Sequence, residues 1–227
     1  MGPRIPVPFS NDYLTASTTT INANSTLVKA VECLKNSSST GTHLASPMKY
    51  AARYLLGMDA NNLGSLPART GTVRKAIIFE TDGAPNEQIT TGGSTTLSTA
   101  GDISSAATNT DTACTNLTGV AANAKAATPG ILVVTVAFNA AKIDSTDKCS
   151  TAGGSAWLVD TLAAAASPAP SGAASTANFD CSTTAGQNSE NSDGDFFFCA
   201  GSGTDMAPIF KTAFGQIANG IKMIALP

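Results

Sequence analysis

The chain has 227 residues, of which 42% are hydrophobic and 13% are charged, so it can bury a proper core as one large domain. A net charge of −3 provides no basic surface for phosphates, which excludes nucleic-acid binding. The charged fraction is about half the usual globular value, and the abundance of Ser, Thr, Ala, Gly and Asn is typical of an extracytoplasmic bacterial protein.

The N-terminal quarter of the sequence predicts two short strands followed by two helices. Residues 5–10 are predicted as a strand and residues 13–17 as an edge strand. The first helix is capped by Asn24 or Ser25, and its predicted buried stripe is Leu27, Ala30, Val31 and Leu34. The second helix begins after Thr42, and its predicted apolar face is Leu44, Met48, Ala51, Ala52 and Leu55.

The remaining sequence predicts strands that alternate with helices. The predicted strands cover residues 74–80, 130–138 and 196–200, and the predicted helices cover 117–127, 155–166 and about 204–224. Low-complexity insertions within the single domain 1–227 are predicted at about 84–115, 139–154 and 167–194. The alternation favours a mostly parallel sheet, which binds ligands at the carboxyl ends of its strands.

The cysteines favour disulfides over a metal site. None of the five forms a C-x-x-C pair and the chain has one histidine, so zinc binding is not expected. We predict a bridge among Cys149, Cys181 and Cys199 in an oxidising compartment, with Cys33 as an unpaired buried thiol. No apolar run approaches the roughly 20 residues that span a bilayer, so we expect any export signal or membrane anchor to lie outside these residues.

Three short motifs occur in a characteristic order: VPFS at 7–10, GTHL at 41–44 and IIFETDG at 77–83. Together they resemble a von Willebrand factor type A domain. With the ending FFFCAGSGTDMAPIFKTAFGQIANGI they are most similar to the tight-adherence pilus-assembly subgroup of bacterial envelope proteins. The resemblance implies a three-layer, Rossmann-like α/β fold, with a mostly parallel sheet, helices on both faces and one antiparallel edge strand.

The resemblance also implies a binding site and a non-enzymatic adhesion or assembly function. Thr42 and Asp82 match the family's metal-binding threonine and aspartate, which hold Mg²⁺ or a similar divalent cation that receives a carboxylate from a protein partner. Thr42, His43 and Asp82 are therefore the predicted partner-binding residues. Outside the resemblance, Asp82 is an ordinary turn aspartate and Thr42 a helix N-cap.

One family motif, D-x-S-x-S at the end of the first strand, is absent, so the implied metal site is partial. The chain then begins at the family's second strand and lacks the central one, which leaves two strand edges unpaired. Three interpretations stay open: another polypeptide supplies the strand or the chain oligomerises, the second strand moves over, or the product is truncated and of low stability.

Other features have simpler interpretations. Glu190 with Asp193-Gly194-Asp195 lacks the spacing of a calcium loop, so we interpret it as a solvated acidic turn rather than a Ca²⁺ site. Residues 196–198 are interpreted as a core strand. His43 is accompanied by no nucleophile motif, which argues against a hydrolase. The alternative to a binding module is a scaffold domain with a degenerate, metal-free site.

Overall fold

The computed structural model describes most of the middle of the chain and part of its ends. The described residues are 12–16, 18–32, 42–58, 75–81, 83–85, 93–103, 111–138, 140, 142, 147–149, 155–201, 207–209, 211–212 and 215. The predicted strand at 5–10, Cys33 and Asp82 lie outside these residues, as does most of the predicted last helix.

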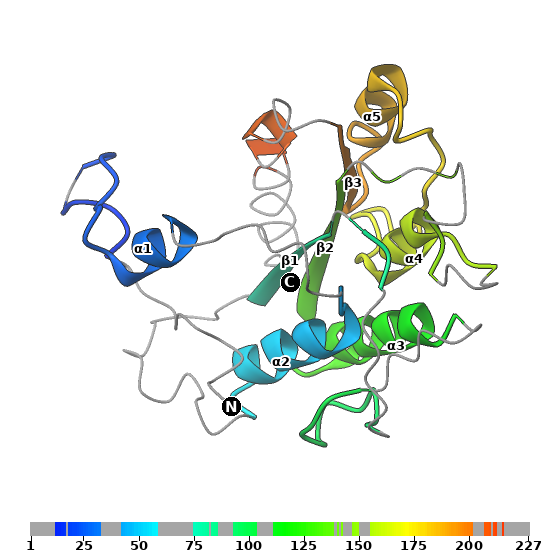
Figure 1. Ribbon diagram of the computed structural model, residues 1–227, viewed down its shortest axis with the longest axis horizontal. Helices are drawn as coiled ribbons and strands as arrows, with labels where there is room; N and C mark the ends of the chain where they lie inside the picture. The colour runs from blue at the N-terminus through cyan, green and yellow to red at the C-terminus, as the bar shows by residue number, and fades with distance from the viewer. Residues whose placement is uncertain are drawn as a thin grey trace.

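A three-stranded parallel sheet forms the centre of the fold (Figure 1). Its strands in spatial order are β1 (Lys75–Thr81), β2 (Ile131–Phe138) and β3 (Phe197–Ala200). Each lies within one residue of the strand predicted from its apolar run. All of β3 is buried and β2 is mostly buried, whereas β1 is mostly half-buried. The described residues include no strand on the other side of β1.

Three helices pack together against this sheet: α2 (Ala45–Leu55), α3 (Thr112–Ala126) and α4 (Leu158–Ala165). Figure 1 shows α2 beside α3, with α4 at the other end of α3. The predicted apolar face of α2 is confirmed, since Leu44, Met48 and Leu55 are buried. Parallel strands joined through helices are the βαβ arrangement that the alternation predicted. No helix in the described part is both long and apolar enough to cross a membrane.

Helix α3 begins five residues before its predicted start at Leu117. The residue before the helix, Asp111, accepts hydrogen bonds from the amides of Ser155 and Ala156, which fixes this end of α3 to the segment before α4. Ties of this kind join residues far apart in sequence, so helical periodicity does not predict them.

The N-terminal region differs most from the prediction. Helix α1 (Thr26–Glu32) forms, and the Ser25 hydroxyl caps it by accepting from the Leu27 amide at 3.2 Å. However, Leu27 is 39% exposed, because α1 lies apart from the α2–α4 layer (Figure 1). The predicted edge strand at 13–17 is also wrong. A single antiparallel bridge joins Leu14 to Ile21, and threonine hydroxyls hold the turn between them.

The insertion predicted at 84–115 contributes to the core. Leu97 and Ile103 are buried in the main cluster, so residues 93–103 cover α2 and are not a purely surface excursion. Two buried cations of α2 hold this segment through its carbonyl oxygens. Lys49 Nζ donates to Ser94 at 2.7 Å, and the Arg53 guanidinium donates to Leu97.

The insertion predicted at 167–194 is also structured. It contains α5 (Thr184–Glu190), which packs beside β3. Before α5, Ser167 pairs with Val133 through two hydrogen bonds of 2.8 and 2.9 Å, at a level of β2 that β3 does not reach. The Ser175 hydroxyl then donates to the Ser167 carbonyl at 2.7 Å. Small polar residues allow this close approach, and their composition resembles that of a surface loop.

Candidate functional site

The loop before α2 and the loop after β1 meet, as the predicted site requires. Thr42 precedes α2 by three residues, and its Oγ1 lies 4.0 Å from the position that a Cβ on Gly83 would occupy. The chain turns sharply there, because Thr81 Oγ1 donates to the Gly83 carbonyl at 2.8 Å and accepts from the Gly83 amide at 3.3 Å. Asp82 itself lies outside the described residues. The structure thus brings Thr42 to the carboxyl end of β1.

His43 connects this edge of the sheet to the segment that covers α2. Its Nδ1 accepts from the Ser46 amide at 3.3 Å, so its Nε2 carries the proton and donates to the Ile103 carbonyl at 3.2 Å. The Ser46 hydroxyl in turn accepts from the Ile103 amide at 3.0 Å. His43, rather than Thr42, therefore satisfies an amide in the first turn of α2. The half-buried ring is held by both nitrogens, which gives this loop a fixed shape.

Lys49 and Arg53 are buried cations that stabilise the same region. Burial lowers the pKa of Lys49, as does the neighbouring Arg53, while Asp102 opposes this shift. Neither cation is distinguished by the sequence around it. Lysine and arginine on a helix normally mark the solvent face, and only the packing of residues 93–103 over them reveals their role.

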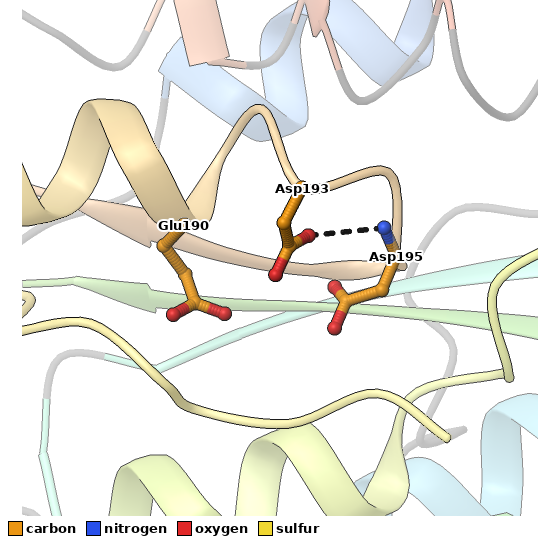
Figure 2. A group of neighbouring side chains, drawn as sticks. All are labelled: Glu190, Asp193 and Asp195. Atoms are coloured by element: carbon orange, nitrogen blue, oxygen red, sulfur yellow. Dashed lines mark hydrogen bonds between the residues drawn. The ribbon is translucent and has the colours of Figure 1, made fainter. Parts of the chain in front are cut away.

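A second group of polar side chains lies beside β3, where α5 ends. Glu190 is the last residue of α5, and Asp193 and Asp195 lie in the turn that leads into β3 (Figure 2). One oxygen from each carboxylate belongs to a group in which all three atoms lie within 4.8 Å of one another. The turn includes Gly194 with a φ of +92°, a conformation that favours glycine. We call these three residues the acidic cluster.

Two members of the acidic cluster are buried. Glu190 is 0% exposed and Asp195 is 6% exposed, whereas Asp193 is exposed. The interpretation of this segment as a solvated acidic turn is therefore wrong for Glu190 and Asp195. The burial arises because residues 173–179 pass beside the turn, a tertiary contact that the local sequence does not encode.

Backbone amides orient the carboxylates of the acidic cluster. Glu190 Oε2 accepts from the amides of Asn178 and Phe179 at 3.1 and 2.9 Å. Asp195 accepts from the amides of Thr176 and Phe197 at 3.0 and 2.7 Å. Asp193 accepts from the Asp195 amide at 3.1 Å. The arrangement is rigid, and its oxygens suit a hard cation.

Burial raises the pKa of Glu190 to about 7, and the charges of Asp193 and Asp195 add to this effect against the two amide hydrogen bonds. The pKa of Asp195 is also raised, first by burial and then by Asp193. Concentrated negative charge in a buried place is thus the main electrostatic feature of the acidic cluster.

Two disulfides fix the loops around the sheet. Cys181 bonds to Cys199 of β3, a pairing within the predicted set of three cysteines. Cys149 bonds instead to Cys114 of α3, a residue that the prediction did not include. Cys114 lies where α3 extends beyond its predicted start. The early start and the second bridge were therefore missed together.

The described residues at the Thr42 edge do not by themselves fit a divalent cation. Thr42 provides one hydroxyl, while the Thr81 hydroxyl is already bonded to Gly83. In the described part of the chain, the acidic cluster is the only group of three or more Asp, Glu, His or Cys residues that could hold an ion, and it lies elsewhere. A Mg²⁺ site at the edge would need Asp82 and further ligands.

Comparison of the chain with models of protein families, with curated proteins and with solved structures returns no match. The structure shows a mixed α/β domain with a parallel sheet. Function must therefore be argued from the residues and their arrangement.

Proposed function

We propose that the chain is a von Willebrand A-like binding or assembly module of a bacterial envelope protein, without enzymatic activity. A protein partner docks at the carboxyl end of β1, on the surface formed by Thr42, His43 and Asp82. The observation that carries this proposal is the approach of Thr42 to Gly83 from a distant part of the chain, with Thr42 Oγ1 4.0 Å from the position that a Cβ on Gly83 would occupy. Two loops that meet at the carboxyl edge of a parallel sheet form the usual place for ligand binding in such folds.

Two further observations support the proposal. The parallel order β1-β2-β3, with α3 and α4 between the strands, is compatible with the second half of a Rossmann-like sheet. The disulfides of Cys114 and Cys181 are typical of proteins in oxidising, extracytoplasmic compartments. The full three-layer fold, its antiparallel edge strand and the donation of a strand by a second polypeptide belong to this proposal.

Partner binding in this proposal rests on shape and hydrogen bonding, and no step is derived through a bound metal. If the edge does hold Mg²⁺, Thr42 and Asp82 are the residues of this chain that would contact it. Metal dependence is tested in a Glu190→Gln background, where the acidic cluster contributes least. Stabilisation by millimolar Mg²⁺ that disappears with Asp82→Ala would show a functioning metal site at the edge.

The scaffold alternative is favoured by one specific observation. Both nitrogens of His43 are engaged with Ser46 and Ile103, so the residue has a structural role that needs no partner. Under this alternative no partner protein binds at the Thr42 edge, and substitution of Asp82 leaves every interaction of the protein with its partners unchanged.

A photocrosslinking amino acid at position 43 separates the two functions. The experiment is done in the cells from which the sequence derives. If a protein partner binds at the Thr42 edge, ultraviolet light should link position 43 to that one partner. The matched control carries the same amino acid at Phe179, which is 43% exposed and lies beside the acidic cluster. An adduct from position 43 that Asp82→Ala abolishes supports binding at the edge. Adducts from neither position, or equally from both, contradict it.

A further inference from the structure

The acidic cluster gathers three carboxylates, and no cation in the described part of the chain pairs with them. Their oxygens lie within 4.8 Å of one another. Their hydrogen-bond partners in the described part of the chain are backbone amides. Among the residues that the structure describes, no lysine, arginine or histidine forms an ion pair with Glu190, Asp193 or Asp195. Amide dipoles only partly offset three like charges that are held so close together.

Glu190 gives a second and independent sign of a missing ligand. Its side chain is 0% exposed, and Oε1 is a buried oxygen that has no hydrogen-bond partner among the described residues. Figure 2 shows the Glu190 carboxylate below and to one side of Asp193, with one of its two oxygens on the side that faces Asp193 and Asp195. A buried oxygen of this kind is costly, so native proteins nearly always supply it with a donor or a cation.

The chemistry of the oxygens favours calcium over other ions. The absence of cysteine and histidine from the acidic cluster argues against zinc. Ca²⁺ accepts irregular sets of carboxylate oxygens at bonds of about 2.4 Å, whereas Mg²⁺ demands near-ideal octahedral geometry at about 2.1 Å and keeps several of its waters. Three carboxylates that backbone amides hold in place therefore suit Ca²⁺ better than Mg²⁺.

We infer that Glu190, Asp193 and Asp195 bind one calcium ion, which fixes the turn between α5 and β3 against residues 176–179. Asp193 is exposed, so water reaches the ion and completes its coordination shell.

The test is a calcium titration of the full chain by isothermal calorimetry after treatment with EDTA. We expect one Ca²⁺ per chain, weaker binding of Mg²⁺ and a higher Tm with Ca²⁺. Asp193→Asn changes an exposed ligand without disturbing the core, and we expect it to weaken Ca²⁺ binding by about tenfold or more. Glu190→Gln, which keeps the size of the side chain, should abolish binding.

Two controls locate the ion. Asp160→Asn removes an exposed carboxylate on α4 and should leave Ca²⁺ affinity unchanged. Asp82→Ala should also leave it unchanged, which separates this site from any ion at the Thr42 edge. The inference is overturned if the chain binds no Ca²⁺ at millimolar concentration, if it prefers Mg²⁺, or if Asp193→Asn and Glu190→Gln bind Ca²⁺ like the unaltered chain.

Discussion

Removal of the Cys181–Cys199 disulfide should have a large and measurable effect on stability. The bridge closes a loop with a sequence separation of 18, and the Cys114–Cys149 bridge closes one of 35. In the loop-entropy model these separations correspond to about 3 and about 4 kcal/mol of stabilisation. Their combined loss, about 7 kcal/mol, is comparable with the whole stability of a typical domain. We therefore expect the fully reduced chain to be largely unfolded at 37 °C.

The assay is urea unfolding of the unaltered chain and of a Cys181→Ala, Cys199→Ala double variant. Alanine is chosen because both cysteines are buried and a serine hydroxyl would lack a partner. The double variant should lose about 3 kcal/mol. Thiol titration gives a check that does not depend on stability. Of five cysteines, four are in bridges, so the unfolded, unreduced chain should show one free thiol.

The reasoning is refuted if all five thiols react without a reductant, or if reduction leaves the unfolding midpoint unchanged. A loss of stability in the double variant together with unchanged Ca²⁺ affinity would show how the acidic cluster is held in place. Cys181 and Cys199 bracket the acidic cluster in sequence, so removal of their bridge should also loosen the cluster. Calcium binding without this dependence would mean that the amides of residues 176–179 are sufficient to hold the carboxylates.

Three further predictions concern single side chains. Lys125 Nζ donates to the last carbonyls of α4, so Lys125→Met should lower the free energy of unfolding in urea by about 1–3 kcal/mol. The control Lys142→Met removes an exposed ion pair with Asp160 and should lower it by less than about 1 kcal/mol. Equal losses in the two variants would contradict this. In EDTA, the free energy of unfolding should be highest below pH 4.5 and should fall by up to about 3 kcal/mol as the pH rises to about 7, because Glu190 holds its proton more tightly in the folded chain, where its pKa is raised, than in the unfolded chain. Glu190→Gln should remove this pH dependence. His43→Phe leaves two hydrogen-bonding groups unpaired and should cost about 1–3 kcal/mol, and a neutral result would show that the loop does not depend on the ring.

The sheet could be predicted from sequence because its signal is local. The runs that became β2 and β3 are almost continuously apolar, which is the property that a strand covered on both faces needs, and β1 has a shorter apolar run at 76–79. The face of α2 was predictable for the same reason, since helical spacing alone places Met48 and Leu55 on one side.

The insertions could not be predicted because their structure depends on distant partners. Leu97 and Ile103 are the apolar residues that anchor one insertion, and they stand among Thr, Ser and Gly with no periodicity. Helix α5 has a sequence rich in small polar residues and is held by its Thr183 cap and its contact with β3. The composition of both insertions indicated surface loops, but contacts with distant parts of the chain give them ordered structure.

The candidate site was predictable only as a meeting of loops. The carboxyl end of β1 and the turn before α2 follow from strand and helix positions, and the approach of Thr42 to Gly83 agrees with them. The burial of Glu190 and Asp195 could not be foreseen, because it depends on residues 173–179 passing beside them. Three carboxylates within six residues were the available signal, and their spacing matched no known loop.

The sheet separates the two proposed regions by strand. The Thr42 edge lies at the carboxyl end of β1, and the acidic cluster lies where α5 ends and β3 begins. Strand β2 stands between β1 and β3, so these two strands are about 10 Å apart. We therefore expect Ca²⁺ in the acidic cluster and a partner at the Thr42 edge to bind independently, and an effect of EDTA on partner binding that persists in Glu190→Gln would have to arise at the edge itself.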